Sequence, residues 1–183
     1  MTFEELKRFC STDEWRPELH EPFLANLGPH DVEDGDKERF AVATDGALLI
    51  ADRSIATLTR IVMPDGLVSL IYSSLHRVER WFPWPLASGA VQVNCRCNAC
   101  HGKNDSCRDC GGEGIERAVM TQAGWVRRAY VEALASLDGI ECGVPCGSVP
   151  LHFRYATGVG AVMPLHSWVK VLGAGETVVA GDA

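Results

Sequence analysis

The stretch Cys95–Gly114, CRCNACHGKNDSCRDCGGEG, carries five of the chain's eight cysteines. Four of them form two C-x-x-C pairs that are separated by six residues. A C-x-x-C turn directs two thiolates toward one ion, and two such turns supply the four sulfurs of a tetrahedral zinc site. The sequence therefore predicts one structural Zn²⁺ with no position left for a catalytic water. Its predicted ligands are Cys97, Cys100, Cys107 and Cys110.

Glycines follow both cysteine pairs where the backbone must turn beneath a bound metal. Gly102 comes two residues after Cys100, and Gly112 and Gly114 come two and four residues after Cys110. Glycine relieves steric crowding at such turns. Two other interpretations are a loop with free thiols and a redox dithiol, but a dithiol needs one pair and explains half of the pattern.

The remaining cysteines of interest do not belong to the two pairs. Cys95 could replace Cys97 as a ligand, although C-x4-C is a less usual turn than C-x2-C. Cys142 and Cys146 form a C-x3-C pattern that could hold a second metal, act as a thiol pair or be buried in a hairpin. We expect none of these three cysteines to bind the zinc.

Composition indicates a soluble globular protein. The chain has 183 residues, of which 46% are apolar and 22% charged, and a formal net charge of −7. This length predicts one domain that can bury a core without disulfides. The sequence has no apolar run long enough to span a membrane. Its first residues, MTFEELKRFC, lack the apolar region of a signal peptide. We therefore expect a cytoplasmic protein, in which clustered cysteines more often bind metal than form disulfides.

The two cysteine pairs also resemble part of a known zinc-binding family. CNACHGK and CRDCGGEG resemble two C-x-x-C-x-G-x-G repeats of DnaJ-type cysteine-rich domains. Those domains carry four repeats and two zincs, whereas two repeats here imply at most one. The first repeat lacks its second glycine, and the chain has no His-Pro-Asp tripeptide. The resemblance therefore implies a zinc-binding interaction or chaperone-like protein without a J-domain.

Periodicity outside the cysteine stretch predicts both helices and strands. Apolar spacing favours helices over Phe3–Cys10, with Thr2 as its N-cap, over Met63–Phe82, and over Val126–Leu137, with Thr121 as its cap. The turn Asp45-Gly46 predicts a β-hairpin within residues 39–52. Further strands are expected in EPFLANL (21–27), IERAVM (115–120), VPLHFRYA (149–156) and VGAVMPL (159–165).

Several of these segments resemble the bacterial DNA polymerase sliding clamp, the β subunit. FAVATDGALLIA (40–51) is similar to the clamp's strand pair around A-T-D-G-x-R-L-A, and DEWRPELHEPFLA (13–25) is similar to the segment before it. RIVMPDGLVSLIYSSL (60–75) is similar to the stretch that follows. RAYVEALASLDG (128–139) and SVPLHFRYATGVGAVMPLHS (148–167) resemble the end of the clamp.

The resemblance implies an α+β fold: a single DNA-clamp-like domain, residues 1–183, with helices on one face of a mostly antiparallel sheet. The zinc stretch has no counterpart in the clamp, so we expect an inserted zinc finger over residues 83–114. The chain also departs from the clamp pattern. Leu48 and His166 stand where the clamp has arginines, and the length suffices for one of its three domains.

Two functions follow from these patterns. The first is a non-enzymatic clamp-like module that binds DNA weakly or binds a replication or repair protein, as a monomer or as a homo-oligomer. Its phosphate contacts would be Lys7, Arg8, Arg127 and Arg128. The alternative is a zinc-stabilised interaction or chaperone-like protein with no DNA role. The scattered histidines form no metal-ligand motif, and no nucleotide-binding glycine loop or G-x-S-x-G occurs, so we expect no catalysis.

Overall fold

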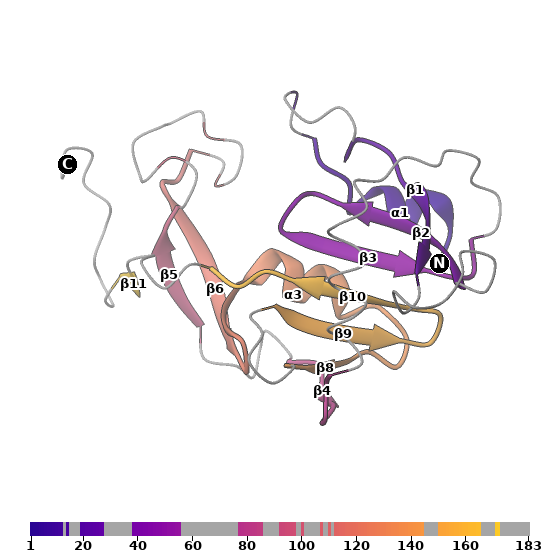
Figure 1. Ribbon diagram of the computed structural model, residues 1–183. Coiled ribbons are helices and arrows are strands. Elements are labelled where there is room, and N and C mark those ends of the chain that lie inside the picture. The colour runs from indigo at the N-terminus through magenta and orange to yellow at the C-terminus, as the bar shows by residue number, and fades with distance from the viewer. Residues whose placement is uncertain are drawn as a thin grey trace. The chain divides into compact units, whose positions relative to one another are not determined.

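The computed structural model divides the chain into two compact units. The first unit comprises Met1–Trp84 and Leu137–Met163, and the second comprises Pro85–Ser136 and Pro164–Ala183. Each unit is built on an antiparallel sheet, as Figure 1 shows. The structure describes residues 1–12, 14, 19–27, 38–55, 77–85, 92–97, 100, 107, 110, 112–144, 150–165 and 171–172.

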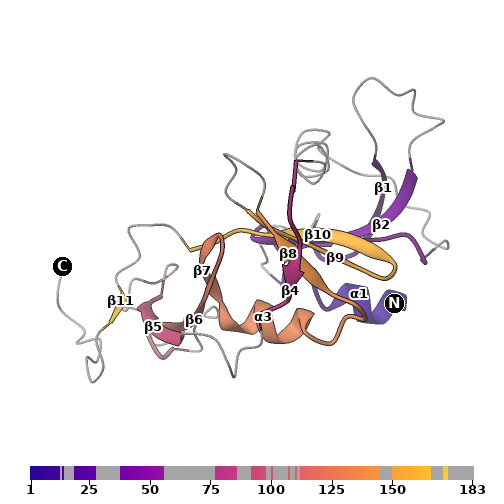
Figure 2. The same ribbon diagram turned by 90° about the horizontal axis from the view of Figure 1, so that it is seen from below.

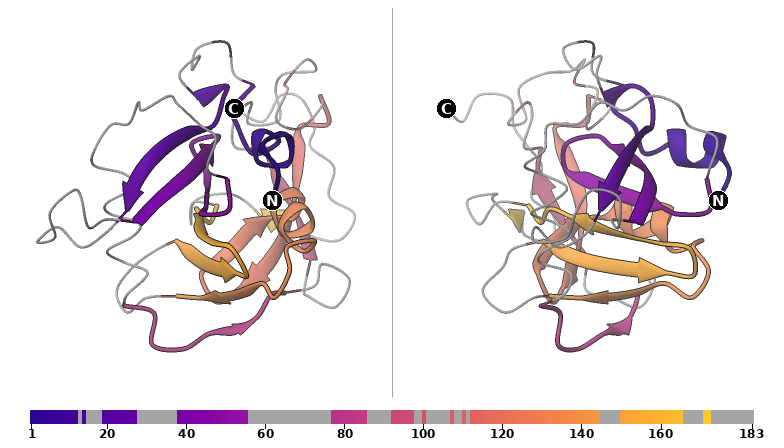
Figure 3. Two further views of the ribbon diagram at one scale, coloured as in Figure 1. Left: turned by 90° about the vertical axis from the view of Figure 1, so that its right-hand side faces the viewer. Right: turned by 45° about the vertical axis from the view of Figure 1, so that its right-hand side comes forward.

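The first unit holds a seven-stranded sheet, and every pairing in it is antiparallel. Strands from both ends of the chain meet at its centre, where β3 pairs with β10. The β9–β10 hairpin beside this junction can be followed in Figure 3. In spatial order the strands are β1 (Phe23–Leu27), β2 (Glu38–Thr44), β3 (Leu48–Asp52), β10 (Gly158–Val162), β9 (Leu151–Tyr155), β8 (Glu141–Gly143) and β4 (Phe82–Pro83).

The turn between β2 and β3 forms at the residues that the sequence indicates. The Asp45 carboxylate Oδ1 accepts hydrogen bonds from the backbone N–H groups of Ala47 and Leu48, at 2.9 and 2.8 Å. Gly46 has a φ of 95°, a left-handed conformation that glycine adopts at little cost. The predicted Asp-Gly hairpin is therefore confirmed.

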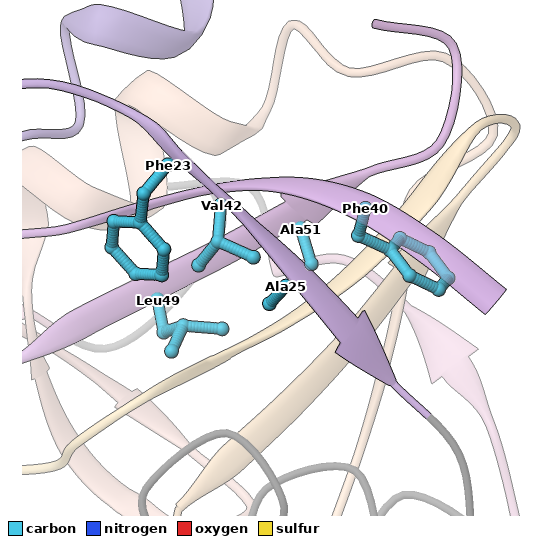
Figure 4. Close-up of a cluster of buried hydrophobic side chains, with 6 residues drawn as sticks. All are labelled: Phe23, Ala25, Phe40, Val42, Leu49 and Ala51. Carbon is cyan, nitrogen blue, oxygen red and sulfur yellow. The ribbon is translucent and has the colours of Figure 1, made fainter. Parts of the chain in front are cut away.

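One face of β1, β2 and β3 carries a compact apolar cluster (Figure 4). Side chains alternate between the two faces of a strand, so alternate residues from each strand meet there. Val159 of β10 packs against the same cluster. The buried members are Phe23, Ala25, Phe40, Val42, Leu49 and Ala51.

Helix α1 (Phe3–Lys7) packs against β2 in the same unit. Thr2 caps it, because its side chain accepts from the Glu5 backbone while the Glu5 carboxylate accepts from the Thr2 backbone. This capping box satisfies two backbone donors of the first turn. Leu6 is fully buried. The predicted Thr2 cap is confirmed, although the helix ends three residues earlier than the predicted Cys10.

The second unit holds a four-stranded antiparallel sheet and helix α3 (Arg128–Leu134). Helix α3 contacts β6 and β7, and these three elements are seen together in Figure 2. Its residues Val131 and Leu134 are fully buried. The strands are, in spatial order, β11 (Val171–Leu172), β5 (Gln92–Arg96), β6 (Ile115–Thr121) and β7 (Gly124–Arg127).

The predicted fold class, an α+β clamp-like domain with its helices on one face of a sheet, is wrong. Strands dominate the described residues, and the two helices found there have five and seven residues. Helix α1 contacts β2 in one sheet, whereas α3 contacts β6 and β7 in the other. The antiparallel pairing itself was anticipated. Whether residues 83–114 form an insertion stays a prediction, although β5 within that range pairs with β6 and β11 outside it.

The helix predicted over Val126–Leu137 begins later than expected. Thr121 caps no helix: its hydroxyl donates to the Gly124 carbonyl and accepts from the Ala123 N–H in a turn. Gly124, with φ 107°, then directs the chain back along β6. Residues 124–127 therefore pair as a strand before α3 starts.

The helix predicted over Met63–Phe82 falls largely outside the described residues. Residues 78–81, within the predicted helix, are not helical, and Phe82 lies in β4. In the described part of the chain, no helix has the length and apolar character needed to cross a membrane.

Gly160 lies in β10 where neighbouring strands leave no room for a side chain. An added methyl group would collide with the Leu49 carbonyl oxygen and the Phe153 ring. We expect Gly160→Ala to lower the free energy of unfolding of the first unit by about 2–3 kcal/mol through overpacking. Urea titration, followed by amide signals of β3 and β10, measures this loss.

Gly139→Ala is the matched control for this substitution. Among the described residues, no neighbouring atom lies within 4 Å of where alanine's methyl group would be at position 139. Gly139 has a φ of 64°. Only the left-handed backbone conformation opposes alanine there, at about 1 kcal/mol. Equal losses in both variants would show that the close approach at Gly160 costs little.

Candidate metal centre

The cysteine cluster lies at the end of the β5–β6 hairpin. Cys97 directly follows β5, and β6 begins at Ile115. The Cys97 N–H donates to the Gly114 carbonyl at 2.9 Å, which extends the hairpin's hydrogen bonding one step beyond its strands. The hairpin thereby fixes the point at which the chain enters the cluster, at Cys97, and the point at which it returns to the sheet, at Gly114.

The four cysteine sulfurs predicted as ligands are brought together. Their Sγ atoms all lie within 4.8 Å of one another. The Cys97 and Cys107 sulfurs are 3.8 Å apart, and the Cys100 and Cys110 sulfurs are 3.7 Å apart. A tetrahedron with a metal–sulfur distance of about 2.3 Å has edges of about 3.8 Å. The sulfurs therefore have the spacing of a four-thiolate metal site, and none of the four forms a disulfide.

The backbone after the second pair turns in the way that its glycines predict. Gly112 and Gly114 have φ values of 85° and 70°. The Gly112 N–H donates to the Cys107 carbonyl at 3.0 Å, and the Gly114 N–H donates to the Cys110 sulfur at 3.2 Å. A donor aimed at sulfur favours the thiolate, which is the form that binds metal. Gly102, after the first pair, lies outside the described residues.

Burial differs between the two sulfurs of each pair. Cys97 and Cys107 are buried, whereas Cys100 and Cys110 are partly exposed. A metal held here would be closed off by four sulfurs and would lie near the surface. Such a donor set is soft and suits zinc or iron rather than magnesium or calcium.

Cys95 is not part of this four-sulfur group. It lies in β5 opposite Glu116 and is fully buried. Burial raises the pKa of its thiol, and the Glu116 carboxylate raises this pKa further. Burial likewise raises the pKa values of Cys10 and Cys142 to about 11, so both stay protonated at neutral pH. Cys146 lies outside the described residues.

The predicted phosphate contacts lie in both units. Lys7 in α1 pairs with Glu21 at 3.5 Å, and the exposed Arg8 follows it at the helix end. Arg127 ends β7 and Arg128 begins α3. Arg127 and Arg128 are therefore consecutive residues at the junction of β7 and α3. Contacts of these basic residues with DNA stay a prediction.

Arg127 is held by a neighbouring carboxylate. Its Nε and a terminal nitrogen approach the two Glu116 oxygens at 2.9 and 3.3 Å. The Glu116 side chain is only 6% exposed, so this two-point pair is largely shielded from water. The Arg127 guanidinium also lies 5.9 Å from the centre of the Tyr130 ring. A phosphate would have to displace Glu116 to take its place, at the cost of a buried unpaired carboxylate.

A pocket of about 340 Å³ adjoins the four-cysteine cluster. Cys110 and Glu113 form one part of its wall, and residues of β6, β7 and α3 form the rest. Its residues Glu116 and Arg117 carry no recognisable motif in the sequence. Their one sequence signal is that they directly follow the knuckle, by which we mean the second cysteine pair, Cys107 and Cys110, with the glycines up to Gly114. Their neighbours from α3 come from more than ten residues away in the sequence.

Comparison of the chain with protein-family models, with curated proteins and with solved structures finds no match.

Proposed function

We propose that this chain is a zinc-stabilised, non-catalytic binding module. The observation that carries the proposal is the tetrahedral spacing of the sulfurs of Cys97, Cys100, Cys107 and Cys110. Four thiolates would fill the coordination sphere of one Zn²⁺, so the metal would be structural. Its role would be to order the chain between β5 and β6.

The binding role rests on where the cluster lies. Two of its cysteines are partly exposed, and a pocket opens beside Cys110. Metal-ordered loops at a sheet end commonly carry contacts to other molecules. This function corresponds to a zinc-stabilised interaction protein and requires neither a clamp-like ring nor a DNA path. DNA, a replication protein or a second copy as partner stays a prediction from the sequence.

Elemental analysis of the purified full-length protein tests the metal assignment. We expect about one zinc per chain and no stoichiometric iron. Replacing the metal with Co²⁺ should give the strong visible absorption of tetrahedral thiolate coordination. A metal content near zero in protein purified under reducing conditions, or an iron content near one, would overturn the zinc proposal.

A further inference from the structure

We propose that the pocket beside Cys110 binds a small ligand through a single oxyanion group, a carboxylate or a phosphate, and that the metal builds this site. The inference rests on the proposed function, because it assigns a task to the metal-ordered knuckle. The pocket measures about 340 Å³ and lies wholly within the second unit. This volume suits a ligand of metabolite size or one side chain of a peptide.

Two arginines supply the charge for the oxyanion. Arg117 of β6 is exposed, and among the described residues it takes part in no ion pair. Arg128 pairs with Glu132 across one helical turn at 2.7 Å, and their side chains are 34% and 51% exposed. An ion pair that water reaches on both sides contributes little to stability, so a ligand oxyanion can compete with Glu132 for Arg128. Guanidinium groups bind carboxylate and phosphate through two parallel hydrogen bonds.

Arg127 has a different task in the same wall. Its two-point pair with Glu116 neutralises the buried carboxylate of the pocket. Because this pair is internal, Glu116 does not repel an incoming anion as an unpaired carboxylate would. Arg127 therefore acts as a positioning residue, whereas Arg117 and Arg128 contact the ligand.

The other lining residues restrict the ligand. Ile115 and Ala129 offer apolar surface beside the arginines, while Glu113 and Glu132 add negative charge to the wall. These two carboxylates and the chain's net charge of −7 disfavour a polyanion such as duplex DNA. They favour a ligand that carries one anionic group together with an apolar part or a hydrogen-bond donor.

The metal enters the site through the knuckle. Cys110 is a candidate ligand, and Glu113 lies three residues later in the turn that Gly112 and Gly114 shape. Both line the pocket. Without metal the knuckle loses its order and this wall is lost. Oxyanion binding should therefore require a metal-loaded protein.

The test is a titration of the metal-loaded full-length protein in Tris chloride, followed by backbone amide NMR. The probes are inorganic phosphate and N-acetylglycine, with sodium chloride as the ionic-strength control. We expect at least one probe to saturate with a Kd on the order of 1 mM, with shifts at Arg117, Arg128 and Ala129. Saturation by phosphate alone assigns a phosphorylated ligand, and saturation by N-acetylglycine alone assigns a carboxylate.

Substitutions then locate the contact. We expect Arg117→Gln and Arg128→Gln each to weaken binding by about tenfold, the effect of losing about 1.4 kcal/mol. The control is Arg154→Gln in the first unit, where Arg154 pairs with Glu141 and lies 4.6 Å from the Trp81 ring centre. It should bind like the wild type. Zinc content measured on each variant shows that the knuckle is intact.

A metal-free sample tests the coupling, after gel filtration has removed the chelator, whose own carboxylates would compete. We expect no saturable binding to it. Absence of saturation by both probes in zinc-loaded protein, or equal binding by Arg117→Gln, would overturn the pocket proposal and leave the metal assignment standing. Equal binding with and without metal would overturn the coupling. A zinc-free native protein would instead overturn the proposed function.

Discussion

Cys110→Ser is expected to abolish metal binding and to disorder the knuckle of the second unit. Cys110 supplies one of four sulfurs that lie within 4.8 Å of one another, and serine offers a harder, weaker ligand in its place. Structural zinc in zinc-finger peptides contributes an apparent free energy of about 10–16 kcal/mol, so its loss outweighs any single contact of the hairpin. The metal content should fall from about one per chain to near zero.

The loss of order should be confined to the second unit. Amide hydrogen exchange is the measurement, because it reports each strand separately. We expect the amides of β5 and of the first residues of β6 to lose protection, since the Cys97–Gly114 backbone bond closes the hairpin end. The amides of β2, β3 and β10 should remain protected, because these strands form the sheet of the other unit.

Cys95→Ser is the matched control. Cys95 lies two residues before Cys97 and is buried, but its sulfur is outside the four-sulfur group. We expect this variant to keep its zinc and to lose about 1 kcal/mol of stability from the buried hydroxyl. Retained zinc in Cys110→Ser, or zinc lost from Cys95→Ser, would show that the ligand set has been assigned incorrectly.

The four-cysteine cluster was predictable because its information is local. Two C-x-x-C turns and the glycines after them determine the directions of four sulfurs within fourteen residues. The β2–β3 hairpin and the Thr2 cap are local in the same sense: Asp45 bonds to residues two and three positions later, and Thr2 bonds to Glu5. In the hairpin and in the cap, the side chain that specifies the structure bonds to a backbone group at most three residues away in the sequence.

The sheet arrangement could not be predicted in this way. Strand β3 pairs with β10, about a hundred residues further along the chain, and Val159 packs on the cluster formed by β1, β2 and β3. Sequence periodicity identified most of these strands but carries no record of their partners. The predicted arrangement of helices on one shared sheet face came from the resemblance to a clamp. The contacts of α1 with one sheet and of α3 with the other contradict it.

The start of α3 shows two local signals in conflict. The apolar positions from Val126 to Leu137 fit a helix, yet the turn through Gly124 pairs Val126 with Val119 of β6. Pairing with a neighbouring strand outweighs helical periodicity over these residues. The pocket was missed for a related reason, because Glu116 and Arg127 meet only once β6 and β7 lie side by side.

A buried carboxylate joins the strands of the first unit. Asp52, at the end of β3, is fully buried, and its Oδ2 accepts hydrogen bonds from the hydroxyls of Tyr155 and Thr157 at 2.9 and 2.7 Å. Its Oδ1 accepts from the Ser54 backbone at 2.7 Å and from the Ser54 hydroxyl. Burial alone would raise the pKa of Asp52, but the bonds from Ser54, Thr157 and Tyr155 outweigh burial and hold this pKa below its ordinary value.

Asp52→Ala should therefore be strongly destabilising. It removes the shared acceptor of Tyr155 and Thr157, and a buried hydroxyl without its partner costs about 1–3 kcal/mol. Tyr155 keeps a bond to the Ala51 carbonyl at 3.3 Å, which limits part of the loss. We expect the free energy of unfolding of the first unit to fall by about 3 kcal/mol in urea titration at pH 7. Asp138→Ala, at an exposed position, should change it by less than about 0.5 kcal/mol.

The pH dependence separates the charge of Asp52 from its shape. A carboxylate whose pKa is lower in the folded protein stabilises the fold above its unfolded pKa, about 3.9 for Asp, and loses that contribution as the pH falls through the folded pKa.

Asp52→Asn keeps one acceptor oxygen and the side-chain shape but cannot ionise. We expect the wild type to be more stable than Asp52→Asn at pH 7 and at pH 5, with a gap that narrows below about pH 4. Urea titrations of both proteins, followed by the amide signals of β3 and β9, measure the gap. A gap that stays constant from pH 7 to pH 3 would contradict the assignment, because it would show that the ionised form of Asp52 contributes nothing to folding.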